Sequence, residues 1–139
     1  MKLKYSLLFV PCLLFLSCKT YTVTPESFKS QFSNVDYDLS TSKSISGSIY
    51  YNGFQIKKIN VVDKNGETQM LDNAPSLEMR VTLNNGKRNH FYFDSMKLKN
   101  DTLTGYKARL LPWMTVKIPF SEVVKIEIQE SGKKIKYMN

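Results

Sequence analysis

The strictest constraint on the fold is the segment Leu77–Leu83, where apolar and polar residues alternate without a break. Its apolar members are Leu77, Met79, Val81 and Leu83. Successive side chains of a strand point to opposite faces, so this period of two predicts a strand with one buried and one solvated face. Asn85-Gly86 follows, and this dipeptide favours the tight turn of a β-hairpin. We therefore expect residues 90–93 to pair back against the strand.

The chain after residue 48 keeps this character, with short β-prone runs separated by turn residues. Asn65-Gly66 and Asn100-Asp101 predict further tight turns, and Pro119 ends a strand because it cannot donate to a sheet ladder. We expect about eight strands. Ser40–Ser48, rich in Ser and Thr without a period, is expected to be a flexible connection or an irregular edge. The predicted fold is mainly β, a small antiparallel barrel or roll, with a two-sheet β-sandwich as the alternative.

One short helix is expected ahead of these strands, over Pro25–Phe32. Thr24 suits the N-cap, proline suits the first helical position, and Glu26 places an acid in the first turn. Phe28 and Phe32 are four residues apart, so they would share one face of the helix and pack on the core.

The first 20 residues have the composition of an export signal that ends in a cysteine. Lys2 and Lys4 form a short basic segment. The uncharged run Leu7–Leu16 is well short of the roughly 20 apolar residues that a membrane span needs. A cut before Cys18 would place bulky Phe15 at position −3, where ordinary signal peptidase prefers a small residue. This pattern indicates a different processing route.

Ser17-Cys18 resembles the end of the lipobox of bacterial lipoprotein precursors, whose cysteine carries diacylglycerol. Phe15 and Leu16 depart from the strict pattern and are similar to the looser lipoboxes of Bacteroidota. The resemblance implies a signal peptide at 1–17, lipidation of Cys18 and a tether at 18–24. From their length and their strand pattern, residues 25–139 are expected to form a single β-rich domain. Lys19–Val23 has no acidic cluster, which in the lipoprotein pattern implies the periplasmic face of the outer membrane.

Two later segments are similar to ones found in small envelope proteins of Bacteroidota. They are Asn100–Gly105, with the sequence NDTLTG, and Ile118–Val123, with the sequence IPFSEV. The similarity implies a β-roll and brings no activity with it.

Cysteine and histidine usage limits the chemistry. If Cys12 leaves with the signal and Cys18 is acylated, the domain has no free thiol, which excludes cysteine nucleophiles and thiolate metal sites. His90 is the only histidine, so acid-base chemistry would have to be built around it. The candidate carboxylates for this chemistry are Asp94, Asp101 and Glu122, which follow His90 in the chain. Single residues at arbitrary spacing do not by themselves predict a catalytic pocket.

No cofactor or metal is expected. Asp36 and Asp38 are two residues apart on a strand-like segment, which suggests calcium ligation. A calcium site needs more oxygen ligands than two carboxylates supply, so a solvated pair is the preferred interpretation.

The chain is basic, with 20 Lys and Arg against 12 Asp and Glu and a formal net charge of +8. Several lysines alternate with aliphatic residues on the expected strands: Lys97, Lys99, Lys117, Lys125, Lys134 and Lys136. Alternation would send these lysines to one outer face, either a solvated face or a basic surface for anionic lipid headgroups or an acidic partner. An exported protein rarely meets nucleic acid, so we expect no nucleic-acid partner.

An apolar loop is expected between two strands, at Leu110–Met114. It includes Leu111, Met114 and Trp113, the only tryptophan of the chain. If exposed, these side chains would suit a partner, because aromatic residues and Met dominate such contacts. If buried, they would close one end of the core.

These observations favour a membrane-anchored envelope lipoprotein that acts as a non-enzymatic binding or assembly module. Its expected partners are the membrane, through the lipid on Cys18, and an envelope protein. The candidate contacts are Trp113, Leu111, Met114, Lys97, Lys99 and Lys125. One alternative is an envelope hydrolase or other enzyme that uses His90 and nearby carboxylates. Another is a carrier of small apolar ligands, which requires a hollow barrel.

Overall fold

The computed structural model describes residues 19–44, 47–54, 56–108, 111, 113–130 and 136–137, so the expected signal peptide and Cys18 lie outside the described residues. Within these ranges the chain forms twelve strands and one α-helix. In chain order the elements are β1 (Thr20–Val23), α1 (Pro25–Phe32), β2 (Tyr37–Ser44), β3 (Gly47–Phe54), β4 (Lys58–Val62), β5 (Thr68–Asp72), β6 (Leu77–Leu83), β7 (Arg88–Tyr92), the 3-10 helix η1 (Phe93–Ser95), β8 (Lys97–Lys99), β9 (Thr102–Tyr106), β10 (Thr115–Pro119), the 3-10 helix η2 (Phe120–Glu122), β11 (Val123–Glu130) and β12 (Lys136–Tyr137).

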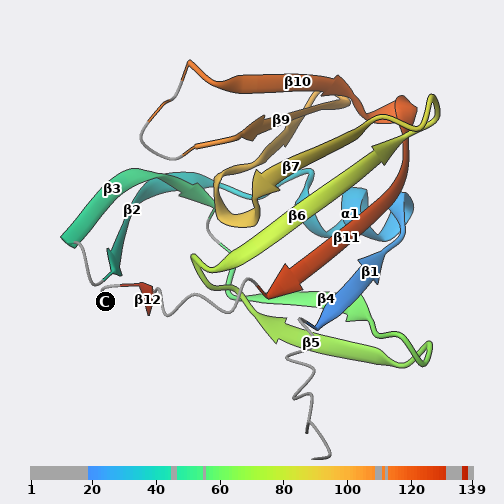
Figure 1. Cartoon of the computed structure of the whole chain (residues 1–139), viewed down its shortest axis with the longest axis horizontal. Coiled ribbons are helices and arrows are strands. Elements are labelled where there is room, and N and C mark those ends of the chain that lie inside the picture. Colours follow the sequence, from blue (N-terminus) through green and yellow to red (C-terminus); the bar gives the residue numbers. More distant parts are fainter. Residues whose placement is uncertain are drawn as a thin grey trace, which may run out of the picture.

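The strands form three antiparallel sheets (Figure 1). The largest has six strands in the order β5-β4-β1-β11-β6-β7, and the two smaller ones have the orders β10-β9-β8 and β12-β2-β3. The mainly β prediction is confirmed. Among the described strands no sheet closes on itself, since β5 and β7 remain the edges of the six-stranded sheet. The fold is thus an open roll or sandwich, and the closed barrel is not formed.

Strand β6 confirms the alternation read from the sequence. Its burial alternates along all seven residues, with Leu77, Met79, Val81 and Leu83 buried. The hairpin turns also form as predicted, because Gly66 and Gly86 adopt φ values of +84° and +81° that L side chains rarely accept. Asn100 and Asp101 take φ values of 50° and 52° in the β8–β9 turn, a conformation that Asn and Asp tolerate.

Helix α1 forms over the predicted residues and joins the core through its aromatic face. The hydroxyl of Thr24 caps it by accepting a hydrogen bond from the Ser27 N–H at 3.2 Å. Phe28 and Phe32 are fully buried, with ring centroids 4.5 Å apart. Phe28 stacks on Phe120 at 5.8 Å, and Phe32 meets the edge of Phe93 at 5.6 Å. The two 3-10 helices and α1 thus share one aromatic cluster.

The prediction for Ser40–Ser48 is wrong for residues 40–44 and 47–48, whereas residues 45 and 46 lie outside the described residues. Backbone pairing runs from Tyr37 opposite Phe54 to Ser44 opposite Gly47, so this region belongs to a long hairpin of β2 and β3. Ladder hydrogen bonds come from the backbone, so a polar segment without side-chain alternation can still be a strand when a partner lies beside it. Because segments without side-chain alternation can form strands in this way, twelve strands are found among the described residues where about eight were expected.

Part of the segment 18–24, which was predicted to be a tether, belongs to the six-stranded sheet. Thr20–Val23 form β1, which lies between β4 and β11, and Tyr21 and Val23 are buried. The carbonyl of Lys19 accepts a hydrogen bond from the Glu130 N–H at 3.3 Å. Four residues are too few to display a period, so the position of this strand is decided by its partners.

Gly105 of β9 packs directly against the ring of Phe91 of β7. A Cβ on this glycine would lie 2.2 Å from Cδ1 of Phe91, which is closer than real Cβ contacts. Phe91 is 2% exposed, so its ring cannot move out into solvent to make room. Position 105 therefore requires glycine because of the close packing of the two strands.

We expect Gly105→Ala to lower the free energy of unfolding by about 1–3 kcal/mol, because the added methyl group overpacks the contact with Phe91. Urea denaturation of the purified protein measures this change. Thr104→Ala, at the neighbouring half-buried position of β9, serves as the control and should cost less. Equal stability of Gly105→Ala and the wild type would contradict the assigned packing.

Candidate functional site

A row of polar side chains crosses the outer face of the six-stranded sheet. The strand registers place Thr22 of β1 opposite Glu127 of β11, Glu127 opposite Arg80 of β6, and Arg80 opposite His90 of β7. The neighbouring positions Met79 and Val81 are buried, so the row lies on the face turned away from the core. Residues from four strands are thereby brought side by side.

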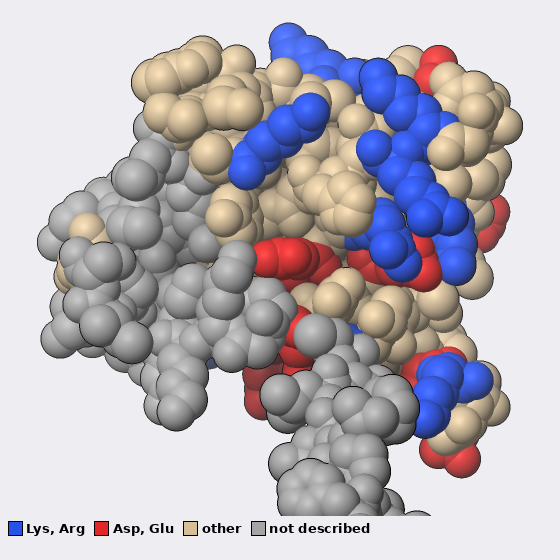
Figure 2. Space-filling view, viewed as in Figure 1, with Lys and Arg blue, Asp and Glu red and all other residues tan. Residues whose placement is uncertain are grey.

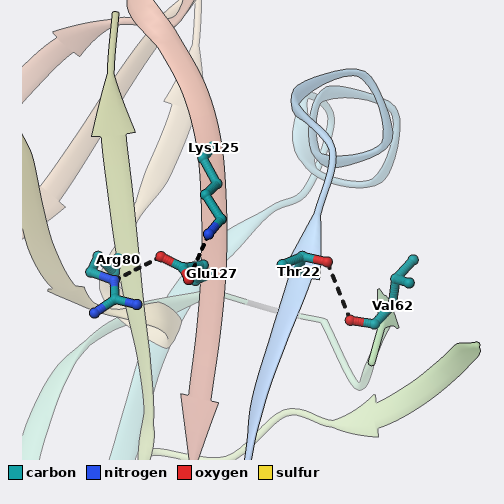
Figure 3. Close-up of polar contacts among 5 residues, drawn as sticks. All are labelled: Thr22, Val62, Arg80, Lys125 and Glu127. Carbon is teal, nitrogen blue, oxygen red and sulfur yellow. Dashed lines mark hydrogen bonds and ion pairs between the residues drawn. The ribbon is translucent and has the colours of Figure 1, made fainter. Parts of the chain in front are cut away.

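Glu127 is the centre of this row (Figure 3). One of its carboxylate oxygens lies 2.7 Å from Nε of Arg80 and the other 3.0 Å from Nζ of Lys125. The carboxylate is only 12% exposed, so solvent screens these contacts less than it would screen a pair at the surface. The hydrogen bond from Arg80 is the main cause that lowers the pKa of Glu127 from 4.5 to about 2. Burial opposes this change and Lys125 adds to it.

Beside this row, a shallow groove of about 170 Å³ runs between the edge of β7 and the end of β9. Its lining consists of Glu78, His90, Phe91, Tyr92 and Lys107. A second hollow, lined in part by Arg80, His90 and Glu127, holds only about 10 Å³, which is room for about one water molecule. The groove therefore brings His90 together with one carboxylate and one lysine.

The acids that the sequence suggested for His90 do not line this groove. Asp94 is fully buried in η1. Asp101 lies in the β8–β9 turn and forms an ion pair with Lys29 of α1. Glu122 lies in η2, where its carbonyl accepts a hydrogen bond from the Asn84 N–H at 2.8 Å. The carboxylates near His90 are instead Glu78 and Glu127. Glu78 lies on β6, the strand before β7 in the same hairpin, and Glu127 lies on β11, which is distant in sequence.

Among the described residues no group of three or more His, Cys, Asp or Glu could hold a metal ion. Asp36 precedes β2, and the side chain of Asp38 lies outside the described residues. The described part of the chain supplies no further ligand for a calcium ion at this pair.

The connection between β9 and β10 carries the most exposed large apolar side chain that the structure describes. Trp113 is 76% exposed and Met114 is 42% exposed, whereas Leu111 is half-buried. We call Leu111, Trp113 and Met114 the Trp113 tip. The Met114 N–H donates to the carbonyl of Leu111 at 2.8 Å, and the Lys107 N–H donates to the carbonyl of Met114 at 3.2 Å. The tip is thus held by the backbone while Trp113 faces solvent, and it does not close the core.

The lysines expected on one face are divided between sheets. Lys97, Lys99 and Lys117 are exposed on β8 and β10, around the buried Leu98 and Ile118. We call the outer side of the β10-β9-β8 sheet, with these three residues, the lysine face.

Lys125 lies elsewhere, on β11 in the six-stranded sheet, where it pairs with Glu127. Lys134 and the side chain of Lys136 lie outside the described residues. The prediction of a single basic face is therefore wrong, because it treated strands of different sheets as one surface.

Arg80, Glu127, Glu78 and Lys107 were not identified as site residues from the sequence. The alternation of β6 indicates that Glu78 and Arg80 occupy a solvated face, so the sequence alone could have identified them as accessible polar residues. The contact of Arg80 with Glu127 joins residues 47 positions apart, and the order of strands in the sheet decides it.

No family model, no curated protein and no solved structure matches this chain. In the described part of the chain, no helix has the length and apolar character needed to cross a membrane.

The ion pairs of Glu127 predict a defined pH dependence of stability. The pKa of Glu127 in the folded state lies below the unfolded value, so the unfolded chain takes up the proton first as the pH falls. Its contribution, on the order of 1–2 kcal/mol after solvent screening, is present in full above about pH 4.5 and is lost as the pH falls toward about 2.

We expect Glu127→Gln to be less stable than the wild type at pH 7, with the difference shrinking below about pH 4.5. Denaturant unfolding of both proteins at pH 2 to 7 measures the difference. Glu67→Gln, which alters an exposed carboxylate in the β4–β5 turn, is the charge-matched control and should change stability by no more than about 0.5 kcal/mol. A difference that stays constant down to pH 2 would contradict the assigned pairing.

Proposed function

We propose that the protein is a lipid-anchored envelope lipoprotein, on the periplasmic face of the outer membrane, that acts as a non-enzymatic binding or assembly module. The observation that carries the binding role is the exposure of Trp113, at 76%. A large aromatic side chain held in solvent by a hydrogen-bonded loop costs little side-chain ordering when a partner buries it. Tryptophan is also among the residues that most often dominate the energy of protein interfaces.

The anchor rests on the sequence around Cys18, and the position of β1 is compatible with it. Lys19 is already hydrogen-bonded to the end of β11, so an acylated Cys18 would hold the six-stranded sheet directly at the bilayer. Two or more acyl chains make such attachment stable, so the domain needs no other membrane contact to remain there.

The alternatives have less support. The groove beside His90 lacks the three acids that the enzyme interpretation named, and it is open and shallow. The carrier interpretation needs a hollow barrel, whereas large side chains fill the described interior. Fully buried examples are Phe28, Phe32, Phe93, Met79 and Met96.

Mass spectrometry of the mature protein from native envelopes should show that the chain begins at Cys18 and carries diacylglycerol. Cys18→Ala should prevent this modification and leave the chain unprocessed. An unmodified Cys18 at the mature terminus, or a mature chain that begins elsewhere, would overturn the proposed anchor.

Trp113→Ala should reduce the recovery of a co-purifying envelope protein about tenfold or more, because it removes the central contact. The free energy of unfolding should change by no more than about 0.5 kcal/mol, since the side chain is exposed. Quantitative affinity capture from native envelopes and urea denaturation measure the two effects.

Met70→Ala is the matched control for this experiment. Met70 is a large apolar residue that is 64% exposed, and it lies on β5, at the edge of the six-stranded sheet and away from the Trp113 tip. It should leave partner recovery unchanged. Equal recovery with Trp113→Ala and with Met70→Ala would count against the Trp113 tip as the contact surface.

A further inference from the structure

Strand β7 is a free edge of the six-stranded sheet. In the described part of the chain it pairs with β6 on one side and with no strand on the other. The β6–β7 turn fixes which of its backbone groups are used, because the Leu83 N–H donates to the carbonyl of Lys87 at 2.9 Å. Hydrogen-bonded and non-hydrogen-bonded pairs alternate along an antiparallel ladder, so Arg88 and His90 occupy non-hydrogen-bonded positions opposite β6. The N–H and C=O of Arg88 and His90 therefore point away from β6, toward the open edge.

The groove beside β7 exposes this edge. Three consecutive residues of β7 line the groove: His90, Phe91 and Tyr92. Successive side chains of a strand point to opposite faces, so a hollow that touches all three passes over the edge of the strand, where the backbone lies. Such an edge can bind an extended peptide as a further strand, with main-chain hydrogen bonds supplying affinity and neighbouring pockets supplying specificity. The groove therefore lies where the side chains of an added strand would fit.

The side chains around this edge favour an acidic occupant. Arg88, His90 and Lys107 are exposed, and none of them belongs to an ion pair among the described residues. Glu78 also lines the groove, but it is half-buried and already has an interaction within the protein. Opposite charges on neighbouring strands stabilise their pairing, whereas like charges destabilise it. A second copy paired at the same edge would bring the same basic side chains together, so a segment that carries Asp or Glu is the better occupant.

The groove is continuous with the Trp113 tip. Lys107 lines the groove on the side of β9, and its N–H donates to the carbonyl of Met114 at 3.2 Å. In Figure 1, β7 runs from the β6–β7 turn at the upper right toward the middle, and the connection from β9 to β10 lies at the upper left. Figure 2 shows that Lys and Arg gather mainly in the upper half of the same view. An occupant that leaves the end of β7 past Lys107 therefore reaches the exposed Trp113.

We infer that the free edge of β7 binds an extended, acidic segment of the envelope partner as an added strand, and that this segment continues past Lys107 to the Trp113 tip. This inference rests on the proposed function and specifies how its partner is held. The backbone of the segment bonds the N–H and C=O of Arg88 and His90, and its carboxylates meet the side chains of Arg88 and Lys107. The indole of Trp113 packs at the end of the segment and adds buried apolar contact.

Photo-crosslinking in intact cells with the full-length, anchored protein tests this inference. Met114 is replaced by the photo-reactive residue p-benzoylphenylalanine, which leaves the groove and Trp113 in place. His90→Pro removes the outward N–H of His90 and breaks no ladder bond, because that N–H does not point to β6. We expect His90→Pro to lower the yield of the protein adduct about tenfold or more relative to His90→Ala, which keeps the N–H.

Met70→Pro is the matched control, at the opposite free edge of the same sheet. The Asp63 N–H donates to the carbonyl of Glu67 at 3.0 Å, so the same alternation places Met70 at a non-hydrogen-bonded position of β5. Its N–H therefore points outward, as that of His90 does. Met70→Pro should leave the adduct yield within about twofold of the wild type. Thermal unfolding of both proline variants checks that they remain folded.

The charge of the segment is tested by a second set of variants, which decides the inference if His90→Pro is unfolded. Arg88→Glu combined with Lys107→Glu should lower the adduct yield about fivefold or more, because like charges then face each other. Lys57→Glu combined with Lys64→Glu makes the same change of net charge at exposed positions elsewhere and should leave the yield within about twofold. The crosslinked peptide should contain more Asp and Glu than Lys and Arg.

The outcomes separate this inference from the proposed function. An adduct that is lost in Trp113→Ala but forms equally in folded His90→Pro and His90→Ala would leave the binding module standing and overturn the added strand. An adduct that is insensitive to Arg88→Glu with Lys107→Glu would overturn the acidic segment. Adducts with lipid alone or with a second copy alone would overturn the inference, as would the absence of any adduct. An unmodified Cys18 would overturn the anchor without affecting an adduct that depends on β7.

Discussion

The fold depends on the pairing of β11 with two strands that are distant in the sequence. β11 lies between β1, residues 20–23, and β6, residues 77–83, and is hydrogen-bonded to both. Ile126 and Ile128 are fully buried on one face of β11. Glu127 lies between them on the other face and meets Arg80. One strand thus supplies the centre of the core and the centre of the charged row, and its pairing also fixes Lys19 at the point where an anchor would attach.

The two sheets that carry the candidate surfaces use charge in different ways. On the six-stranded sheet, Glu127 is held between Arg80 and Lys125, so the charges are largely compensated within the protein. A compensated row of this kind contributes to stability and to strand register, and it leaves little attraction for an outside ligand. On the β10-β9-β8 sheet, the lysines face solvent on a side without acids at the described strand positions. The exposed Trp113 tip at the end of the β9 and β10 strands makes this second sheet the better candidate for a partner.

The aromatic residues are divided in a similar way. Phe28, Phe32, Phe93 and Phe120 form the cluster that joins α1 to the two 3-10 helices. Trp113 does not join them and lies in solvent at the end of a hydrogen-bonded loop. The domain therefore completes its core without its largest side chain, which leaves Trp113 available for an interaction outside the domain. The close contact of Gly105 with Phe91 packs the β9 strand that leads to Trp113 against the core.

The sequence by itself determined the local features of this protein. The alternation of Leu77–Leu83, the turns at Gly66 and Gly86, and the capped helix with Phe28 and Phe32 follow from steric and periodic rules that act over a few residues. The same rules indicated which lysines point outward on β8 and β10.

Only the tertiary structure decided which of these local pieces lie side by side. It placed β1 inside the sheet, paired the polar strands β2 and β3, and put Lys125 on a different sheet from Lys97 and Lys99. It also brought Glu78 and Glu127 toward His90 in place of Asp94, Asp101 and Glu122. The physical reason is that strand pairing is made by backbone hydrogen bonds, which are nearly the same for every residue. The order of the strands is therefore set by how the whole chain buries its apolar faces, and no short segment contains that information.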